Sequence, residues 1–171
     1  MRVYLKILLI IAMMVGITGY VTSIPQEQKL FNVRYKELTS DVRKQVDCLA
    51  DNIYYEAGYE PEEGKIAVAL VTLNRTQDAR FPKEICSVVK QKVNLVCQFS
   101  WICEPMKVIK HNDVYRKSQD VALHVYANYE MIEDITNGAL YYHADYVNPG
   151  WKLKKTKVIG RHIFYKEGSK I

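Results

Sequence analysis

The sequence predicts an α+β fold, a mainly helical domain with a small antiparallel β-hairpin near its C-terminus. Apolar residues recur at helical spacing in three segments between residues 40 and 130. After Asn137-Gly138, short runs rich in aromatic and β-branched residues replace that pattern, which is typical of strands. The chain has 171 residues, of which 49% are hydrophobic and 25% charged, and this composition excludes collagen, coiled coil and disorder.

The N-terminal segment is typical of an export signal. Arg2 and Lys6 precede a run from Ile7 to Pro25 that carries no charged side chain. Small and polar residues in the second half of this run weaken it as a membrane span. We therefore expect residues 1–23 to be a cleaved signal peptide, with an uncleaved membrane anchor as the alternative, residues 24–38 a linker, and residues 39–171 the folded domain. The expected location is the periplasm or cell envelope.

Export changes the interpretation of the four cysteines, because thiols pair in an oxidising compartment. Their spacing contains no C-x-x-C of the kind found in structural zinc sites. Two disulfides are therefore expected, and four cysteines leave three pairings open. The candidates are Cys48, Cys86, Cys97 and Cys103.

The first helix is predicted to begin after Thr39-Ser40-Asp41, since these residue types cap helix N-termini. Its apolar stripe steps by four, three and four residues through Val42, Val46, Leu49 and Ile53. Three residues further, the stripe reaches Glu56, and Gly58 is expected to end the helix.

Two further long helices and one short one are predicted. Pro61 opens the second helix, which runs to about Arg75 and is apolar all round in its middle, so it belongs in the centre of the domain. A short helical turn is expected at residues 85–89, followed by a loop that contains residues 98–103. Asn112-Asp113 caps the third long helix.

The strands are expected at residues 139–143 and 158–165, with a turn at Asn148-Pro149-Gly150 between them.

Most of the net charge of +5 lies in the leader and after Trp151, where lysines are frequent. Such a run favours a solvated face or attraction to an anionic polymer or membrane surface, and it does not indicate a nucleic-acid partner.

Glu56 is the sharpest catalytic candidate. It prolongs an apolar stripe and lies in the last turn of its helix, so burial and the helix dipole should both disfavour its ionisation. A carboxylic acid that stays protonated near neutral pH can protonate a glycosidic oxygen, as in the lysozyme pattern. Glu60 is either a second carboxylate or a residue of the helix boundary.

A second group comprises His143, Asp145 and His162, because a strand hairpin could bring the two histidines together. That would make a metal site conceivable, although histidines that hold the hairpin or line a groove are favoured. No G-x-S-x-G, P-loop or G-x-G-x-x-G is present, which disfavours α/β-hydrolase, nucleotide and dinucleotide chemistry. We expect neither a cofactor nor a bound metal ion.

Four blocks of the sequence resemble the cell-wall hydrolase family of the SleB/CwlJ type, over about residues 48–165. The blocks are Leu49–Ala57, Glu63–Ala69 with Leu73–Arg75, Cys97–Trp101, and Tyr142–Pro149 with Ile159–Tyr165. The resemblance implies a peptidoglycan-cleaving enzyme with a lysozyme-like or lytic-transglycosylase-like helical core, and its catalytic glutamate falls on Glu56. The family usually has arginine at the position that Gly58 occupies here.

The resulting hypothesis is a monomeric peptidoglycan glycosidase, with a wall-remodelling or endolysin role. Glu56 protonates the oxygen between N-acetylmuramic acid and N-acetylglucosamine and then acts as base, as in a lytic transglycosylase. The expected partner is the glycan strand of peptidoglycan, with membrane attachment through the N-terminal segment if the leader is retained. Two alternatives stay open, a metal-dependent amidase and a non-catalytic wall-binding module. Candidate substrate-binding residues are Glu60, Gln98, Ser100, Tyr142, His143 and His162.

Overall fold

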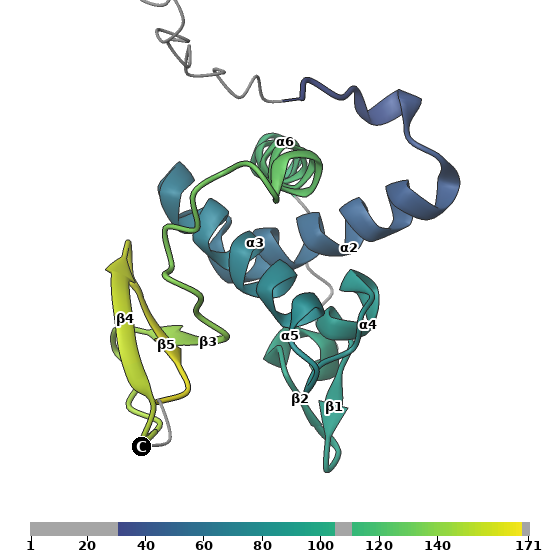
Figure 1. Cartoon of the computed structure of the whole chain (residues 1–171). Helices are drawn as coiled ribbons and strands as arrows, with labels where there is room; N and C mark the ends of the chain where they lie inside the picture. The colour runs from purple at the N-terminus through teal and green to yellow at the C-terminus, as the bar shows by residue number, and fades with distance from the viewer. Residues whose placement is uncertain (1–30, 105–110, 169–171) are drawn as a thin grey trace, which may run out of the picture.

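The computed structural model describes residues 31–104 and 111–168. The expected signal peptide or anchor, residues 1–23, and residues 24–30 of the expected linker lie outside the described residues. The architecture is α+β, as predicted, with a helical layer and two small antiparallel sheets that lie on the side away from α6 (Figure 1). Among the described helices, none is long and apolar enough to cross a membrane.

Helix α2, Ser40–Ala57, begins and ends where the sequence predicts. The side chain of Thr39 caps it by accepting a hydrogen bond from the backbone N–H of Val42. The predicted stripe enters the main core, where Val46, Leu49 and Ile53 are fully buried. Gly58 follows the helix, and a Cβ added there would overlap the carbonyl oxygen of Tyr54. A side chain at this position, such as the arginine usual in the family, would therefore require the backbone to shift.

Helix α3, Glu62–Gln77, is central because it is buried on two sides. Val68 and Leu70 belong to the core that α3 shares with α2, α4 (Ile85–Val89) and α6 (Asn112–Asn128). Ala67 and Val71 belong to a second cluster, together with Phe164 of the C-terminal sheet. This double burial explains the all-round apolar middle of the helix.

The C-terminal sheet has three strands in the order β3-β5-β4, which are Tyr141–Ala144, His162–Lys166 and Lys154–Ile159. The single strand predicted at residues 158–165 is thus wrong, because the chain turns at Gly160, whose φ is +55°. The β4–β5 hairpin forms at this turn, and β3 pairs with β5 on its other side.

A second small sheet lies where the sequence predicts a loop. Strands β1, Lys92–Val93, and β2, Val96–Cys97, form a hairpin, and the short helix α5, Ser100–Cys103, follows it. Asn94 and Leu95 both have positive φ at the turn. Such turns usually contain glycine, so leucine at the second position conceals the hairpin.

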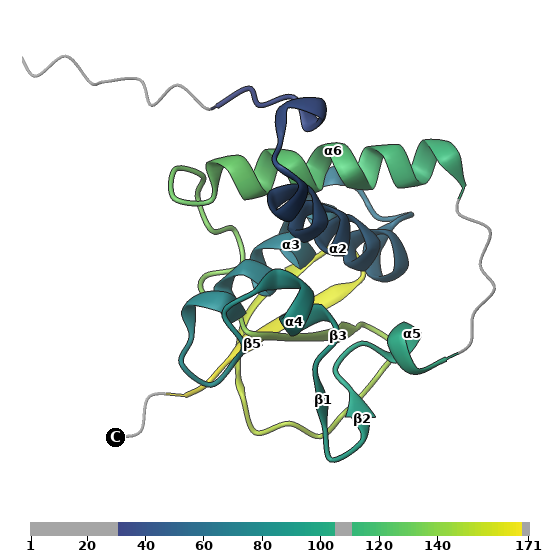
Figure 2. The same cartoon turned by 90° about the vertical axis from the view of Figure 1, so that its right-hand side faces the viewer.

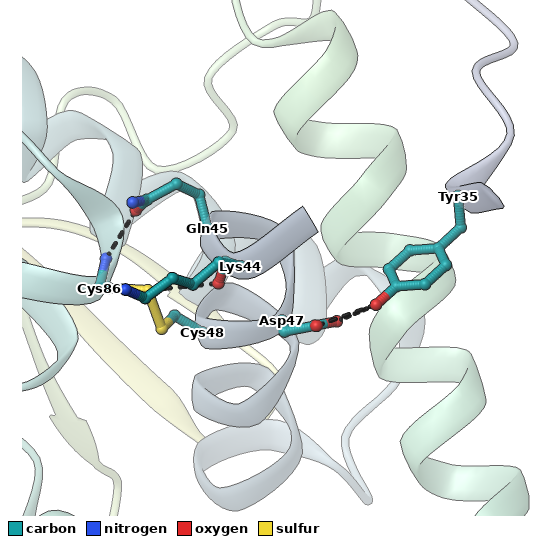
Figure 3. The surroundings of a disulfide bond; sticks show 6 residues. All are labelled: Tyr35, Lys44, Gln45, Asp47, Cys48 and Cys86. Carbon is teal, nitrogen blue, oxygen red and sulfur yellow. Dashed lines mark hydrogen bonds between the residues drawn. A yellow bond between two sulfur atoms is a disulfide. The ribbon is translucent and has the colours of Figure 1, made fainter. Parts of the chain in front are cut away.

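The cysteines pair as Cys48–Cys86 and Cys97–Cys103. The first disulfide joins α2 to α4, and beside it Gln45 Oε1 accepts a hydrogen bond from the Cys86 backbone N–H at 2.9 Å (Figure 3). The second closes a short loop that contains α5.

The 3-10 helix η1, Tyr35–Glu37, packs on α2, where the Tyr35 hydroxyl donates to Asp47 Oδ1 at 2.7 Å (Figure 3).

Candidate active site

Glu56 lies in the last turn of α2, beside a shallow depression of about 270 Å³. The loop from α2 to α3 forms one wall, and His111, just before α6, closes another side. The side chain of Glu56 is partly buried, since it continues the stripe that enters the core. The depression is lined by Tyr54, Tyr55, Glu56, Ala57, Gly58, Tyr59, Glu60 and His111.

Burial raises the pKa of Glu56 from its ordinary value of 4.5 to about 7. The hydrogen bond from Tyr142 and the positive charge of Arg75 act in the opposite direction and lower the pKa, but burial outweighs them. Glu56 is therefore a carboxyl group that exchanges its proton near neutral pH, which suits both donation and later acceptance of a proton.

Tyr142 of β3 holds the Glu56 carboxyl group in place. Its hydroxyl donates to Glu56 Oε2 at 3.2 Å, across 86 positions of the sequence. Asn52, one turn before Glu56 on α2, is fully buried and forms a side-chain hydrogen bond with Tyr142. The Asn52 side chain also donates to Thr72 Oγ1 at 3.1 Å. The proposed acid is thus anchored by a buried polar network from three elements.

Arg75 is a buried cation close enough to act on Glu56. Its Nε donates to the carbonyl oxygen of Leu140 at 2.8 Å. The guanidinium carbon lies 5.3 Å from the ring centres of both Phe81 and Phe99. Arg75, in the last turn of α3, supplies a positive charge that acts on Glu56.

The short disulfide loop brings Trp101 to the same end of α2. The rings of Trp101 and Tyr55 stack with centroids 4.4 Å apart, and Trp101 Nε1 donates to Asn52 Oδ1 at 3.3 Å. In the view of Figure 2, α5 lies at the end of the molecule where β3 passes below α2 and α3. Gln98 and Ser100 are exposed on either side of buried Phe99. The predicted loop therefore does reach the site, where Trp101 contacts Tyr55.

Glu60 is bound to the turn between β4 and β5. Its Oε2 accepts a hydrogen bond from the backbone N–H of Arg161 at 3.0 Å, and its carbonyl oxygen accepts one from Lys65 Nζ. A Cβ at Gly160 would overlap Glu60 Oε2, so this contact explains a glycine at the turn. The Glu60 carboxylate thus has a structural partner of its own.

The two histidines lie on opposite faces of the sheet, so the expectation that a hairpin brings them together is wrong. In the β3–β5 register His162 is opposite Ala144, whereas His143 is opposite Ile163, and side chains alternate between faces. His162 is buried 5.2 Å from the Tyr142 ring, and burial lowers its pKa. His143 is on the face away from Tyr142 and Glu56. Among residues 31–104 and 111–168, no three His, Cys, Asp or Glu side chains are grouped as a metal site would require.

Three residues of the site have no assigned role in the sequence-based prediction, namely Asn52, Arg75 and Trp101. The sequence does indicate a buried role for Asn52, because a polar residue four positions before Glu56 falls on the buried side of the helix. Arg75 similarly follows the apolar middle of α3, as a charged residue in the last turn of the helix. No sequence pattern indicates the role of Trp101, since its approach to Tyr55 depends on how the disulfide loop folds.

Comparison with known proteins adds a family and a fold. The profile of a family described as Cell Wall Hydrolase matches residues 59–165, a range that begins just after Glu56. The spore cortex-lytic enzyme of Oceanobacillus iheyensis is 31% identical over 124 residues, which is 71% of this chain and 41% of that protein. That of Bacillus subtilis is 29% identical over 126 residues, 70% of this chain and 36% of that protein. The chain thus spans less than half the length of these curated relatives.

Two solved structures have the same fold. The catalytic domain of the germination-specific lytic transglycosylase SleB from Bacillus anthracis aligns with a TM-score of 0.57 at 26% identity, over 76% of this chain and 98% of that one. The catalytic domain of the Bacillus cereus SleB protein aligns with a TM-score of 0.53 at 24% identity, over 80% of this chain and all of that one. These alignments agree with the predicted lytic-transglycosylase-like core.

Proposed function

The chain belongs to the cell wall hydrolase family, and from that premise we propose that it is a peptidoglycan glycosidase acting as a lytic transglycosylase. Its substrate is the bond between N-acetylmuramic acid and N-acetylglucosamine. The observation that carries the proposal is the partly buried Glu56 carboxyl group, whose pKa of about 7 allows it to hold a proton near neutral pH. The likeness to a solved lytic transglycosylase domain supports the reaction type.

In the proposed reaction, Glu56 first donates its proton to the oxygen of the glycosidic bond as that bond breaks. The resulting carboxylate then accepts the proton of the 6-hydroxyl group of the same muramic acid residue. That hydroxyl oxygen attacks C1, which gives a 1,6-anhydro product without consuming water. The Tyr142 hydrogen bond orients the carboxyl group, and the Arg75 charge stabilises the carboxylate between the two proton transfers.

The position of Glu60 supports a single-carboxylate mechanism. A retaining glycosidase that forms a covalent intermediate needs a second carboxylate about 5 Å from the first, on the opposite side of the sugar. Glu60 is the other carboxylate at the depression, but its Oε2 is occupied by the N–H of Arg161. Attack by the sugar's own hydroxyl needs no such partner.

The aromatic pair of Tyr55 and Trp101 is proposed as the wall of the glycan groove. Each ring of the stacked pair keeps one face that the other does not cover, and such a face suits contact with the apolar face of a sugar ring. Gln98 and Ser100, exposed beside this pair, are proposed to hydrogen-bond the glycan. The two disulfides support a site of action in the cell envelope, in wall remodelling or lysis.

Digestion of purified peptidoglycan, followed by mass spectrometry of the released muropeptides, tests the proposed reaction. We expect muropeptides that end in 1,6-anhydro-N-acetylmuramic acid. Those products are lighter than the hydrolytic products by about 18 Da, the mass of one water molecule, because the 6-hydroxyl group replaces water as the nucleophile. Reducing ends in place of anhydro ends would show hydrolysis, and free stem peptides with intact glycan would show an amidase.

The rate of cleavage should depend on the protonation of Glu56. Because its pKa is about 7 and the acid form starts the reaction, kcat/KM should fall as the pH rises through about 7. Initial rates on purified peptidoglycan between about pH 5 and 9 measure this dependence, with ionic strength held constant. A rate that is constant across this range, or that increases with pH, would contradict the assignment.

A further inference from the structure

The face of the C-terminal sheet that points away from Glu56 carries a cluster of aromatic side chains. Tyr142 and Phe164 point toward the helices, so their neighbours Tyr141, His143 and Tyr165 point to the other side. Trp151, from the connection between β3 and β4, lies over them, with ring centroids 6.0, 5.5 and 5.9 Å from Tyr141, His143 and Tyr165. We call these four residues the outer aromatic face.

The outer aromatic face is held rigidly but remains accessible. Both ring nitrogens of His143 are engaged, Nδ1 with the carbonyl oxygen of Ala144 at 2.8 Å and Nε2 with the Tyr165 hydroxyl at 2.9 Å. The His143 and Tyr165 rings stack with centroids 5.2 Å apart. Trp151 is nevertheless 42% exposed, and Val158 on the neighbouring strand is 51% exposed. A ligand would meet a preorganised surface and lose little side-chain entropy on binding.

The charge on the β4 side of this face is positive, whereas at its β3 edge the Tyr141 hydroxyl donates to Glu167 Oε1 at 3.1 Å. Lys155 is opposite Tyr165 in the β4–β5 register and therefore lies on this face, and Lys152 is exposed next to Trp151 in the chain. Within the part of the chain that the structure describes, neither of these two lysines forms an ion pair with a carboxylate. Arg161 and Glu167, by contrast, are paired with Asp145 and Arg80.

We propose that the outer aromatic face is a second peptidoglycan-binding surface, which retains the enzyme on the wall polymer while the Glu56 depression cleaves it. Aromatic rings fit the apolar faces of sugar rings, and exposed lysines attract the carboxylates of the muramic acid stem peptides. The surface is distinct from the cleavage site, because alternate residues of β3 face the two sides of the sheet. The identity of this ligand rests on the proposed function.

Cosedimentation with purified peptidoglycan sacculi tests this inference, with every variant made in a Glu56→Gln background so that the polymer stays intact. Trp151→Ala is compared with Phe31→Ala, which removes another exposed aromatic ring. Lys152→Gln/Lys155→Gln is compared with Lys36→Gln/Lys44→Gln, which removes exposed lysines from η1 and α2. The lysine variant also keeps the test valid if Trp151→Ala fails to fold, because the two lysine side chains are exposed and support no core contact.

We expect Trp151→Ala and the Lys152/Lys155 variant each to raise the peptidoglycan concentration at half-saturation by roughly fivefold or more, and the matched controls by less than about twofold. Added salt should weaken binding of the parent more than that of the Lys152/Lys155 variant. Equal binding of variants and controls would overturn the inference. So would variants that retain sacculus binding but lose binding to vesicles of anionic phospholipid, since the partner would then be a membrane.

This readout is independent of cleavage. If the enzyme with Glu56 intact releases no muropeptides while Trp151→Ala still weakens sedimentation, the proposed reaction fails and the binding surface stands. If anhydro-muropeptides are released but the variants bind like their controls, the surface fails and the reaction stands.

Discussion

Glu56→Gln is expected to lower the rate of peptidoglycan cleavage at about pH 6 by a factor on the order of 10³. Glutamine keeps the size of the side chain and can still contact Tyr142, but it cannot donate or accept the proton that the reaction transfers. Release of soluble muropeptides from purified peptidoglycan measures the loss. Glu63→Gln, at an exposed glutamate in the first turn of α3, is the matched control and should retain the full rate.

The same variant should be more stable than the parent at high pH. The Glu56 pKa is about 7 in the folded chain against an ordinary value of 4.5. At pH values between these two, the folded state therefore binds a proton that the unfolded state has released. The parent therefore loses stability as the pH rises from about 4.5 through 7, by roughly 3 kcal/mol at 1.4 kcal/mol per pKa unit. Glutamine does not ionise and avoids this loss.

Denaturant unfolding of both proteins at about pH 5 and pH 8 measures the difference, and it separates a catalytic defect from a folding defect. The free energy of unfolding of Glu56→Gln relative to the parent should increase toward pH 8. A folded variant that retains more than about a tenth of the parent's activity would remove Glu56 from the mechanism, since general acid catalysis contributes at least ~10²-fold.

Removal of the Cys48–Cys86 disulfide is expected to have the largest effect on stability. The two cysteines are buried and separated by 38 positions, and their bond joins α2, which carries Glu56, to α4. Loop-closure entropy for that separation predicts that Cys48→Ala/Cys86→Ala lowers the free energy of unfolding by roughly 4 kcal/mol. Such a loss would be a large fraction of the stability of an ordinary domain.

Cys97→Ala/Cys103→Ala is the matched control, because it removes the same atoms from a loop with a separation of only 6. The same relation predicts a loss of roughly 2 kcal/mol, and these cysteines lie nearer the surface. Denaturant unfolding under non-reducing conditions measures both variants. If the short loop proved to be the more stabilising one, the assignment of Cys48–Cys86 as the main covalent link of the helical core would be wrong.

The helical part of the fold was predictable because its signals are local. Thr39 caps α2, the stripe through Val46 and Ile53 is apolar, and the all-round apolar middle of α3 indicates a central position. The break at Gly160 was not predictable in the same way. The residues on both sides have the strand-like character of one continuous segment, and the need for glycine arises from Glu60, about a hundred positions away.

In the candidate site, too, local features were predictable and long-range contacts were not. Glu56 could be found from its place on the stripe, since helical periodicity is a property of neighbouring residues. Its partner Tyr142 could be associated with it only through the resemblance to a family, because the pairing depends on β3 folding back under α2 and α3. The opposite orientations of His143 and His162 depend on strand register, which a shift of one residue would invert.

The most direct measurement is an NMR titration of the Glu56 side-chain carboxyl carbon in the ¹³C-labelled protein, with Glu56→Gln used to assign the signal. A midpoint near the pKa of about 7 would show that burial keeps this carboxyl group protonated close to neutral pH, as a proton donor to the glycosidic oxygen requires. A midpoint near the ordinary value of 4.5 would contradict it, because Glu56 would then be ionised at neutral pH and without a proton to donate.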